Sequence, residues 1–413
     1  MPLKDLALLM TVGTGIGSEE KRESLAHGLL FSIKNNHPKK IVFFGSSESK
    51  ITIESLKQQY MDEFNEKLDY YEFIKIDEID DFSMYFTKIK SKIHELEEEY
   101  GITIDYTSGT KTMTMAAAFA SMLCGKNLIF ISGKRQNGIV VKGTEKIILQ
   151  NLYLVYDELM ITKIKELFNN NRFETAKVLL DNITDTDKNK KIYTKLLNSY
   201  YAFDNVNYEF ALKNFDIKEF TNKWPSLTKD FQNNIKALNI LNNKKHEFNS
   251  YYVLASLLNN ARRRCEEHKY DDAVARLYRA LELIAQIKLK NYEILTSDVD
   301  ISILKSFNLD KSDIDCLEGT RDKHSGKIKI GLTQGYVLLH KLGDILGKFY
   351  MNNEKLIQNT IQFRNNSILA HGLMSLNEKQ FLEFQKIVND ASAMLNKNMD
   401  SFVNETIFPQ FEL

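Results

Sequence analysis

Near its C-terminal end the chain carries an Arg–Asn pair, Arg364 and Asn365, followed by His371. On one continuous helix the step from Arg364 to His371 turns through about 700°, so both side chains would share a face about 10 Å apart along the axis. Gly372 is expected to end that helix. Histidine transfers protons near neutral pH and the arginine fork binds phosphate oxygens, so the group suits phosphodiester cleavage. A surface arginine and a capping histidine would explain the same pattern.

Two polar loops near the N-terminus form a second candidate site. They span residues 13–18 and 106–112, and each leads into an expected helix. Small residues let backbone N–H groups approach a phosphate, a helix N-terminus favours negative charge, and Lys111 adds a positive charge. We assign ligand binding to Gly13, Thr14, Gly15, Ser46, Thr107, Ser108, Gly109, Thr110 and Lys111.

Neither loop matches the dinucleotide fingerprint G-x-G-x-x-G or the P-loop G-x-x-x-x-G-K-[ST], so ATP hydrolysis by a P-loop is not expected. Tight turns that need glycine for geometry alone remain the alternative for both loops.

Arginine is concentrated in the C-terminal part. Only 10 of the 55 basic residues are arginine, and seven of these lie in the last 163 residues. Because arginine offers a bidentate fork, this clustering favours phosphate contacts there, although residues 262–264 could equally form a solvated helix face.

Metal chemistry has little support in the sequence. Cys265 and His268 could supply half of a zinc site, but no second pair at ligand spacing follows them. We therefore expect no metal site.

The elements that must position these residues differ along the chain. In the first 150 residues, short β-rich runs at 6–10, 41–44, 71–76, 102–105 and 128–131 alternate with amphipathic stretches. This alternation predicts a doubly wound, Rossmann-like α/β sheet, which binds ligands at the carboxyl ends of its strands, where both polar loops lie. Residues 139–141 and 147–149 are expected to form an antiparallel edge hairpin.

From about residue 153 apolar residues recur at helical spacing, which predicts an all-α remainder. An aromatic-x-x-Ala start occurs at Phe173, Tyr208 and Tyr270, with 35 residues between the first two, which is close to a helix-hairpin repeat. We predict a helical linker domain at 153–250 and an all-α domain at 251–413. Within the latter we expect an apolar helix stripe from Ala273 to Ile287, an irregular insertion at 296–331, and helices at 353–369 and 377–399.

Composition excludes several classes of protein. Hydrophobic residues make up 43% and charged residues 27%, as in ordinary globular proteins, and Lys+Arg equals Asp+Glu at 55 each. With no net charge to steer the chain toward nucleic acid or an anionic membrane, any polyanion site must be local. Three cysteines without C-x-x-C spacing, no signal peptide and no long apolar run favour a cytoplasmic protein without membrane contact.

The order of the motifs resembles a known family. D-Y-T-S-G-T-K-T-M at 105–113, in an N-terminal α/β domain, and R-N-N-S-I-L-A-H at 364–371, in a C-terminal helical domain, resemble the CARF-HEPN ribonucleases of type III CRISPR systems. The resemblance implies a CARF-like sensor of cyclic oligoadenylate at 1–152 and a HEPN-like ribonuclease at 251–413. It also implies a homodimer with no cofactor, activated by cyclic tetra- or hexa-adenylate in antiviral defence.

The function predicted from these motifs is cleavage of single-stranded RNA by its own 2′-hydroxyl, without a metal. Arg364 would bind the phosphate, His371 would transfer protons, and Asn365 would orient His371 or the substrate. Two alternatives remain open. The helical domain could be an inactive module that recruits a partner to a ligand-bound sensor, or the N-terminal domain could act as a ring nuclease that degrades its ligand. A transcription regulator is less favoured, because no short basic helix-turn-helix follows the sensor.

Overall fold

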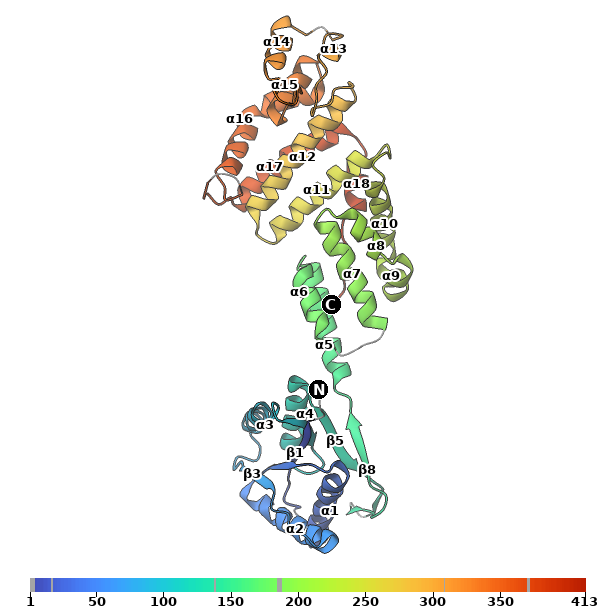
Figure 1. Cartoon of the computed structure of the whole chain (residues 1–413), viewed down its shortest axis with the longest axis vertical. Helices are drawn as coiled ribbons and strands as arrows, with labels where there is room; N and C mark the ends of the chain where they lie inside the picture. Colours follow the sequence, from blue (N-terminus) through green and yellow to red (C-terminus); the bar gives the residue numbers. More distant parts are fainter. Residues whose placement is uncertain (1–3, 16–17, 137–138, 184–187, 308, 370–371) are drawn as a thin grey trace. The chain divides into compact units, whose positions relative to one another are not determined.

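The computed structural model describes residues 4–15, 18–136, 139–183, 188–307, 309–369 and 372–413 (Figure 1). The chain divides into two compact units, Met1–Leu159 and Met160–Leu413.

The first unit is built on a six-stranded sheet with the order β3-β2-β1-β4-β5-β8. The strands are β1 (Asp5–Thr11), β2 (Lys40–Gly45), β3 (Tyr71–Lys75), β4 (Tyr100–Asp105), β5 (Asn127–Ser132) and β8 (Lys146–Gln150). The first five pair in parallel and β8 runs antiparallel to β5. The five predicted strands and the Rossmann-like α/β class are confirmed.

Helices cover both faces of this sheet. Successive strand residues point to opposite faces and are apolar on both, so each face forms an apolar core with its helices. Ala7 and Leu9 of β1 belong to the core beneath α3 (Phe82–Leu96) and α4 (Lys111–Cys124). Leu8 and Met10 belong to the core beneath α1 (Glu19–Asn36) and α2 (Lys50–Phe64), which follows the short 3₁₀ helix η1 (Ser47–Ser49). A strand buried on both sides carries an unbroken apolar run, which is why the sequence pattern identified it.

The predicted edge hairpin is wrong in its pairing. β7 (Ile139–Val140) pairs with β6 (Arg135–Gln136), whereas β8 pairs with β5. The residues between β6 and β7 in the sequence are Asn and Gly, the pair that two-residue hairpin turns favour. Ile147 of β8 instead packs against the core that contains Ile129 of β5. Pairing with β5 therefore buries apolar surface of β8.

The second unit is all-α, as predicted, and one continuous apolar core runs through it from Ile164 to Phe411. The boundary between the units falls within α5 (Tyr153–Asn169). The remaining elements are α6 (Phe173–Asp181), α7 (Lys188–Asp204), α8 (Tyr208–Asn214), α9 (Ile217–Lys223), η2 (Pro225–Leu227), α10 (Thr228–Asn242), α11 (Asn249–Glu266), α12 (Tyr270–Lys290), α13 (Ile301–Leu304), α14 (Lys311–Gly319), α15 (Leu332–Lys341), α16 (Ile345–Asn365), α17 (Glu378–Leu395) and α18 (Met399–Glu405).

Each aromatic-x-x-Ala motif begins a helix: Phe173 begins α6, Tyr208 begins α8 and Tyr270 begins α12. The same turn precedes all three, with a left-handed residue two positions earlier, at Asn171, Val206 and His268. The backbone N–H of the residue that follows each left-handed residue donates to the carbonyl five positions earlier. These bonds run from residue 172 to 167, from 207 to 202 and from 269 to 264. These are helix-ending turns of the Schellman type, so the repeat in sequence is a repeat of turn geometry.

The C-terminal helices depart from the sequence-based boundaries. The apolar stripe of α12 is buried as predicted, but the segment 296–331 contains α13 and α14 rather than irregular chain alone. α15 and α18 were not predicted. α16 begins before the predicted helix and ends at Asn365, four residues earlier than expected.

The C-terminal tail packs into the helices of the linker region. The Phe411 ring lies 4.9 Å from Phe168 and 5.2 Å from Trp224, measured between ring centroids. The Arg263 guanidinium lies 3.8 Å from the centre of the Phe408 ring. Segments from both ends of the second unit therefore share one core.

Candidate functional site

In the first unit, the two predicted ligand loops meet at the carboxyl ends of β1 and β4. The Gly13 N–H donates to Ser108 Oγ at 2.9 Å, and the Thr11 hydroxyl donates to the Ser108 carbonyl. A Cβ on Gly13 would lie 3.0 Å from the Gly109 nitrogen, and Gly109 itself has φ +124°. Glycine is therefore required at both positions by this close approach and by the backbone conformation.

Several of the assigned side chains hold the shape of this site through hydrogen bonds. Thr107 Oγ1 accepts from the Ile131 N–H at 2.8 Å, and Thr110 Oγ1 caps α4 by accepting from the Met113 N–H. Asp105 is fully buried, which raises the pKa of its carboxyl, and it accepts from the Thr107 N–H at 2.7 Å. The loop is thus pre-formed, with its geometry set by hydrogen bonds inside the unit.

The remaining assigned residues differ in their exposure and hydrogen bonding. Lys111 is exposed at the first position of α4, and among the described residues it has no carboxylate partner. Thr14 and Gly15 are partly exposed next to the Gly13 contact. Ser46 follows β2, the neighbour of β1, and its buried hydroxyl has no hydrogen-bond partner among the described residues.

A cavity of about 230 Å³ opens beside these loops. Gly15 and Thr107 line it together with Lys21, Ser24, Leu25, His27, Gly28, Ile131, Arg135, Val140 and Glu145. Lys21, Ser24 and Gly28 recur at helical spacing on α1, a signal that the sequence analysis did not use. A larger hollow on this unit is lined by four carboxylates, of Glu19, Glu23, Asp62 and Glu63, and by two cations, Arg22 and Lys142. This excess of negative charge suits a polyanion less well than the smaller cavity does.

His27 and Glu145 form an ion-pair contact in the smaller cavity, with 2.9 Å between Nε2 and Oε1. Burial raises the pKa of Glu145, but hydrogen bonds from its own backbone, from His27 and from the Gly143 N–H outweigh burial and lower it. Glu145 therefore remains a carboxylate that fixes the His27 ring.

In the second unit, the expectation that Arg364 and His371 lie on one helix is wrong. α16 ends at Asn365, and the chain then turns back, with the Gly372 N–H donating to the Ser367 carbonyl and the Met374 N–H donating to the Asn366 carbonyl. A Cβ on Gly372 would lie 2.1 Å from the Asn366 carbonyl oxygen. Gly372 thus permits this close backbone contact rather than ending a long helix. His371 lies outside the described residues.

Arg364 lies in the last turn of α16, and its Nη1 donates to Asn365 Oδ1 at 3.0 Å. Its guanidinium carbon lies 5.0 Å from the centre of the Tyr278 ring, on α12. Its Nε is buried and has no hydrogen-bond partner among the described residues. No signal in the sequence singles out Tyr278, because its neighbours mark it only as part of an apolar helix.

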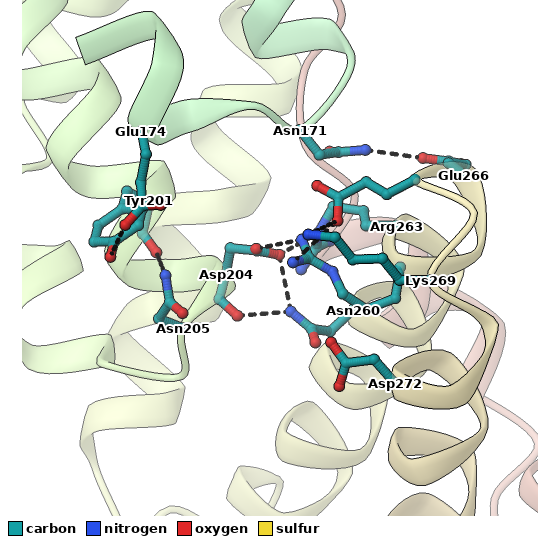
Figure 2. Close-up of polar contacts among 12 residues, drawn as sticks. Asn171, Glu174, Tyr201, Asp204, Asn205, Asn260, Arg263, Glu266, Lys269 and Asp272 are labelled. Atoms are coloured by element: carbon teal, nitrogen blue, oxygen red, sulfur yellow. Dashed lines mark hydrogen bonds and ion pairs between the residues drawn. The ribbon is translucent and has the colours of Figure 1, made fainter. Parts of the chain in front are cut away.

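The other six arginines of the C-terminal part are each paired with a carboxylate. Figure 2 shows buried Asp204 of α7 accepting from Asn260 Nδ2 and Arg263 Nε of α11, at 2.8 and 2.7 Å. Arg264 donates to the same carboxylate at 2.6 Å. Arginine clustering therefore does not create a phosphate surface, and residues 262–264 are not simply a solvated face. Of the seven arginines in the C-terminal part, Arg364 is the one for which the described residues include no carboxylate partner.

Apolar side chains are exposed around the Arg364 segment. Ile368 is 69% exposed and Leu373 is 91% exposed, and Phe363, Leu369 and Met374 are exposed as well. A cluster of large exposed apolar side chains is typical of a protein interface.

Within the described ranges, no three His, Cys, Asp or Glu residues are grouped so that they could hold a metal ion. The sulfur of Cys265 is partly buried against the core, and His268 Nδ1 lies 2.9 Å from the Tyr270 hydroxyl. None of the described helices is long and apolar enough to cross a bilayer.

Comparison with known proteins identifies the second unit. The family profile described as the Csm6 6H domain matches residues 156–250, and the one described as the Csm6 HEPN domain matches residues 242–395. No curated protein sequence matches the chain.

Two solved structures are similar. Enterococcus italicus Csm6 bound to cyclic hexa-2′-fluoro-hexa-dAMP has a TM-score of 0.62 at 15% identity, covering 97% of this chain and 94% of that chain. Can2 from Sulfobacillus thermosulfidooxidans in complex with cyclic tetra-adenylate has a TM-score of 0.24 at 11% identity, covering 53% and 69%. The former shares the fold over nearly the whole chain.

Proposed function

The chain belongs to the Csm6 family of CARF-HEPN proteins of type III CRISPR systems, and we propose that it is a metal-independent endoribonuclease activated by cyclic oligoadenylate. The observation that carries the proposal is the state of Arg364. Six arginines of the C-terminal part are each paired with a carboxylate, whereas Arg364 has no such partner among the described residues and can bind a phosphate oxygen.

The proposed reaction uses a nucleophile that the RNA carries itself. The 2′-hydroxyl oxygen bonds to the adjacent phosphorus while the bond from phosphorus to the 5′-oxygen breaks, which leaves a 2′,3′-cyclic phosphate and a 5′-hydroxyl. Arg364 binds the phosphoryl oxygens as charge develops on them, and His371 transfers a proton from the nucleophile or to the leaving oxygen. Asn365 accepts a hydrogen bond from Arg364 and so orients its guanidinium. This is in addition to its predicted role of orienting His371 or the substrate.

A homodimer completes the proposed active site. One chain supplies a single Arg364 and a single His371, and a two-fold axis beside the Arg364 segment would bring two copies of each together. The exposed side chains of Phe363, Ile368, Leu369, Leu373 and Met374 surround this segment and would be buried by such a contact. We therefore place the catalytic dimer contact at this surface.

Cyclic oligoadenylate is the proposed activator, and the loops of the first unit are its proposed site. The pre-formed glycine loops, the N-terminus of α4 and the cations Lys21, Lys111 and Arg135 suit a phosphate-bearing ring. The similar Csm6 structure holds a cyclic hexanucleotide analogue, so cyclic hexa-adenylate is tested beside the tetra-adenylate.

The test is cleavage of single-stranded RNA by the purified chain in EDTA, with each cyclic adenylate added in turn. We expect cleavage that depends on the activator and is lost in Arg364→Ala and His371→Ala. Arg321→Ala is the matched control, because Arg321 pairs with Glu318 on the surface. The proposal would be refuted if neither cyclic adenylate produced RNA cleavage, or if His371→Ala cleaved RNA at the wild-type rate.

The fate of the ligand separates the alternatives. Chromatography of the cyclic adenylate after incubation distinguishes the bound, intact ring of a pure sensor from the linear product of a ring nuclease. RNA left intact beside either result would favour that alternative over the ribonuclease.

A further inference from the structure

Few contacts occupy the hydrogen-bond donors of Arg364. Its one hydrogen bond to a side chain is with its neighbour Asn365, and among the described residues no carboxylate pairs with it. Its Nε is buried without a hydrogen-bond partner. A long side chain with several rotatable bonds is not fixed by such contacts alone, so another group must hold the guanidinium in place.

The Tyr278 ring is the group on another helix that meets this guanidinium. The guanidinium carbon lies 5.0 Å from the ring centre, within the range of a cation–π contact. Burial, and then the charge of Glu282, raise the pKa of the Tyr278 phenol, so the ring stays neutral at physiological pH. The contact is therefore one between a cation and the face of an uncharged ring.

The helix beneath this contact is firmly seated. Leu277 and Leu281 flank Tyr278 on α12 and are fully buried. The buried Tyr336 hydroxyl of α15 donates to the Leu281 carbonyl at 2.9 Å. Tyr278 thus projects from a packed helix, and its ring is a fixed platform for the more exposed end of α16.

The neighbouring residue shows the opposite arrangement. Arg279 Nη1 donates to Glu282 at 2.9 Å and to Gln286 at 3.0 Å, so both N–H groups of this nitrogen are occupied. A ring face attracts a guanidinium without accepting its in-plane N–H groups, so the donors remain free for a phosphate. Holding Arg364 by a ring rather than by a carboxylate preserves its ability to bind substrate.

We infer that Tyr278 is a positioning residue, which orients the Arg364 guanidinium for the scissile phosphate through its ring face. The inference rests on the proposed ribonuclease function. The hydroxyl of Tyr278 has no part in it, so Tyr278→Phe should cleave RNA at close to the wild-type rate. Tyr278→Leu removes the ring and should lower kcat about ten- to hundredfold with little change in KM.

Fluorination of the ring gives the decisive measurement. Phenylalanine and its mono-, di- and trifluorinated analogues at position 278 weaken the ring face stepwise at nearly constant volume, so folding is preserved. We expect kcat to fall with each added fluorine while the unfolding transition stays unchanged. The same series at Tyr201, whose ring faces Lys177 at 5.0 Å, is the matched control and should leave kcat unchanged.

A kcat that does not vary with fluorination at position 278 would overturn the inference, as would a Tyr278→Leu variant with wild-type kcat. Arg364→Ala is assayed in parallel. If the wild type cleaves RNA, Arg364→Ala does not, and the fluorine series is flat, then the positioning role fails while the proposed function stands. If the activated wild type does not cleave RNA, the proposed function itself fails.

Discussion

Removing the Asp204 carboxylate should destabilise the second unit strongly. This carboxylate accepts from Asn260, Arg263 and Arg264 at 2.8, 2.7 and 2.6 Å, and the side chains of Asp204 and Arg263 are only 6% and 5% exposed. In Asp204→Ala the Arg263 guanidinium stays buried against the Phe408 ring without its counter-charge. Leaving one partner of a buried ion pair unpaired costs about 3–5 kcal/mol, roughly a fifth or more of the stability of an ordinary domain.

The single tryptophan allows the stability of the second unit to be measured separately from that of the first. Trp224 is 9% exposed in the core of the second unit, so its fluorescence during urea unfolding reports on that unit within the intact chain. Glu318→Ala is the matched control, because Glu318 and Arg321 form an exposed pair of the kind that contributes at most about 1 kcal/mol. Asp204→Leu combined with Arg263→Met should recover much of the loss, since no buried charge then lacks a partner.

The reasoning would be refuted by a loss below about 1 kcal/mol in Asp204→Ala, the size of an exposed pair. It would be refuted equally if the double variant were less stable than Asp204→Ala, because the loss would then not come from the unpaired guanidinium.

Three further outcomes follow from local geometry. Gly372→Ala should abolish activator-dependent RNA cleavage, because a Cβ there would lie 2.1 Å from the Asn366 carbonyl oxygen and must displace the chain around the Arg–His motif; cleavage at the wild-type rate would contradict this. Val206→Gly should stabilise the second unit by about 1 kcal/mol in the tryptophan assay, because φ of Val206 is +61°, and a loss of stability would show that the turn is unstrained. The partners of Glu145, His27 among them, lower the pKa of its carboxyl below the usual value of 4.5. Its contribution to the free energy of unfolding is therefore fully present above pH 4.5 and is lost as the pH falls below that value. The stability difference between wild type and Glu145→Gln, followed by circular dichroism, should therefore shrink below pH 4.5, and a difference that grows on acidification would contradict the assignment.

Local sequence was sufficient for the five parallel strands and for the starts of several helices. The buried runs of β1 and β2 and the aromatic-x-x-Ala starts of α6, α8 and α12 each depend on residues close together in the chain. Where a boundary depended on a distant contact, prediction failed. α16 ends at Asn365 because the chain folds back to place Gly372 against Asn366, and neither residue alone indicates that turn.

The candidate sites show the same limit. The glycine and threonine spacing singled out both candidate ligand loops. The hydrogen bond from Gly13 to Ser108 and the cavity with His27 and Glu145, however, join segments about a hundred residues apart. The pairing of β8 with β5 likewise depends on which core receives Ile147.

Residue types and short-range spacing by themselves determined the α/β and all-α parts, the two loops and the Arg–His motif. Only the tertiary structure decided which arginine is available for chemistry. Arg263 and Arg364 are identical in type and both lie on helices, yet one is buried against Asp204 and the other lies on the Tyr278 ring with no carboxylate beside it among the described residues. A guanidinium binds a phosphate only when its charge and donors are not already occupied, and that depends on neighbours that folding alone brings together.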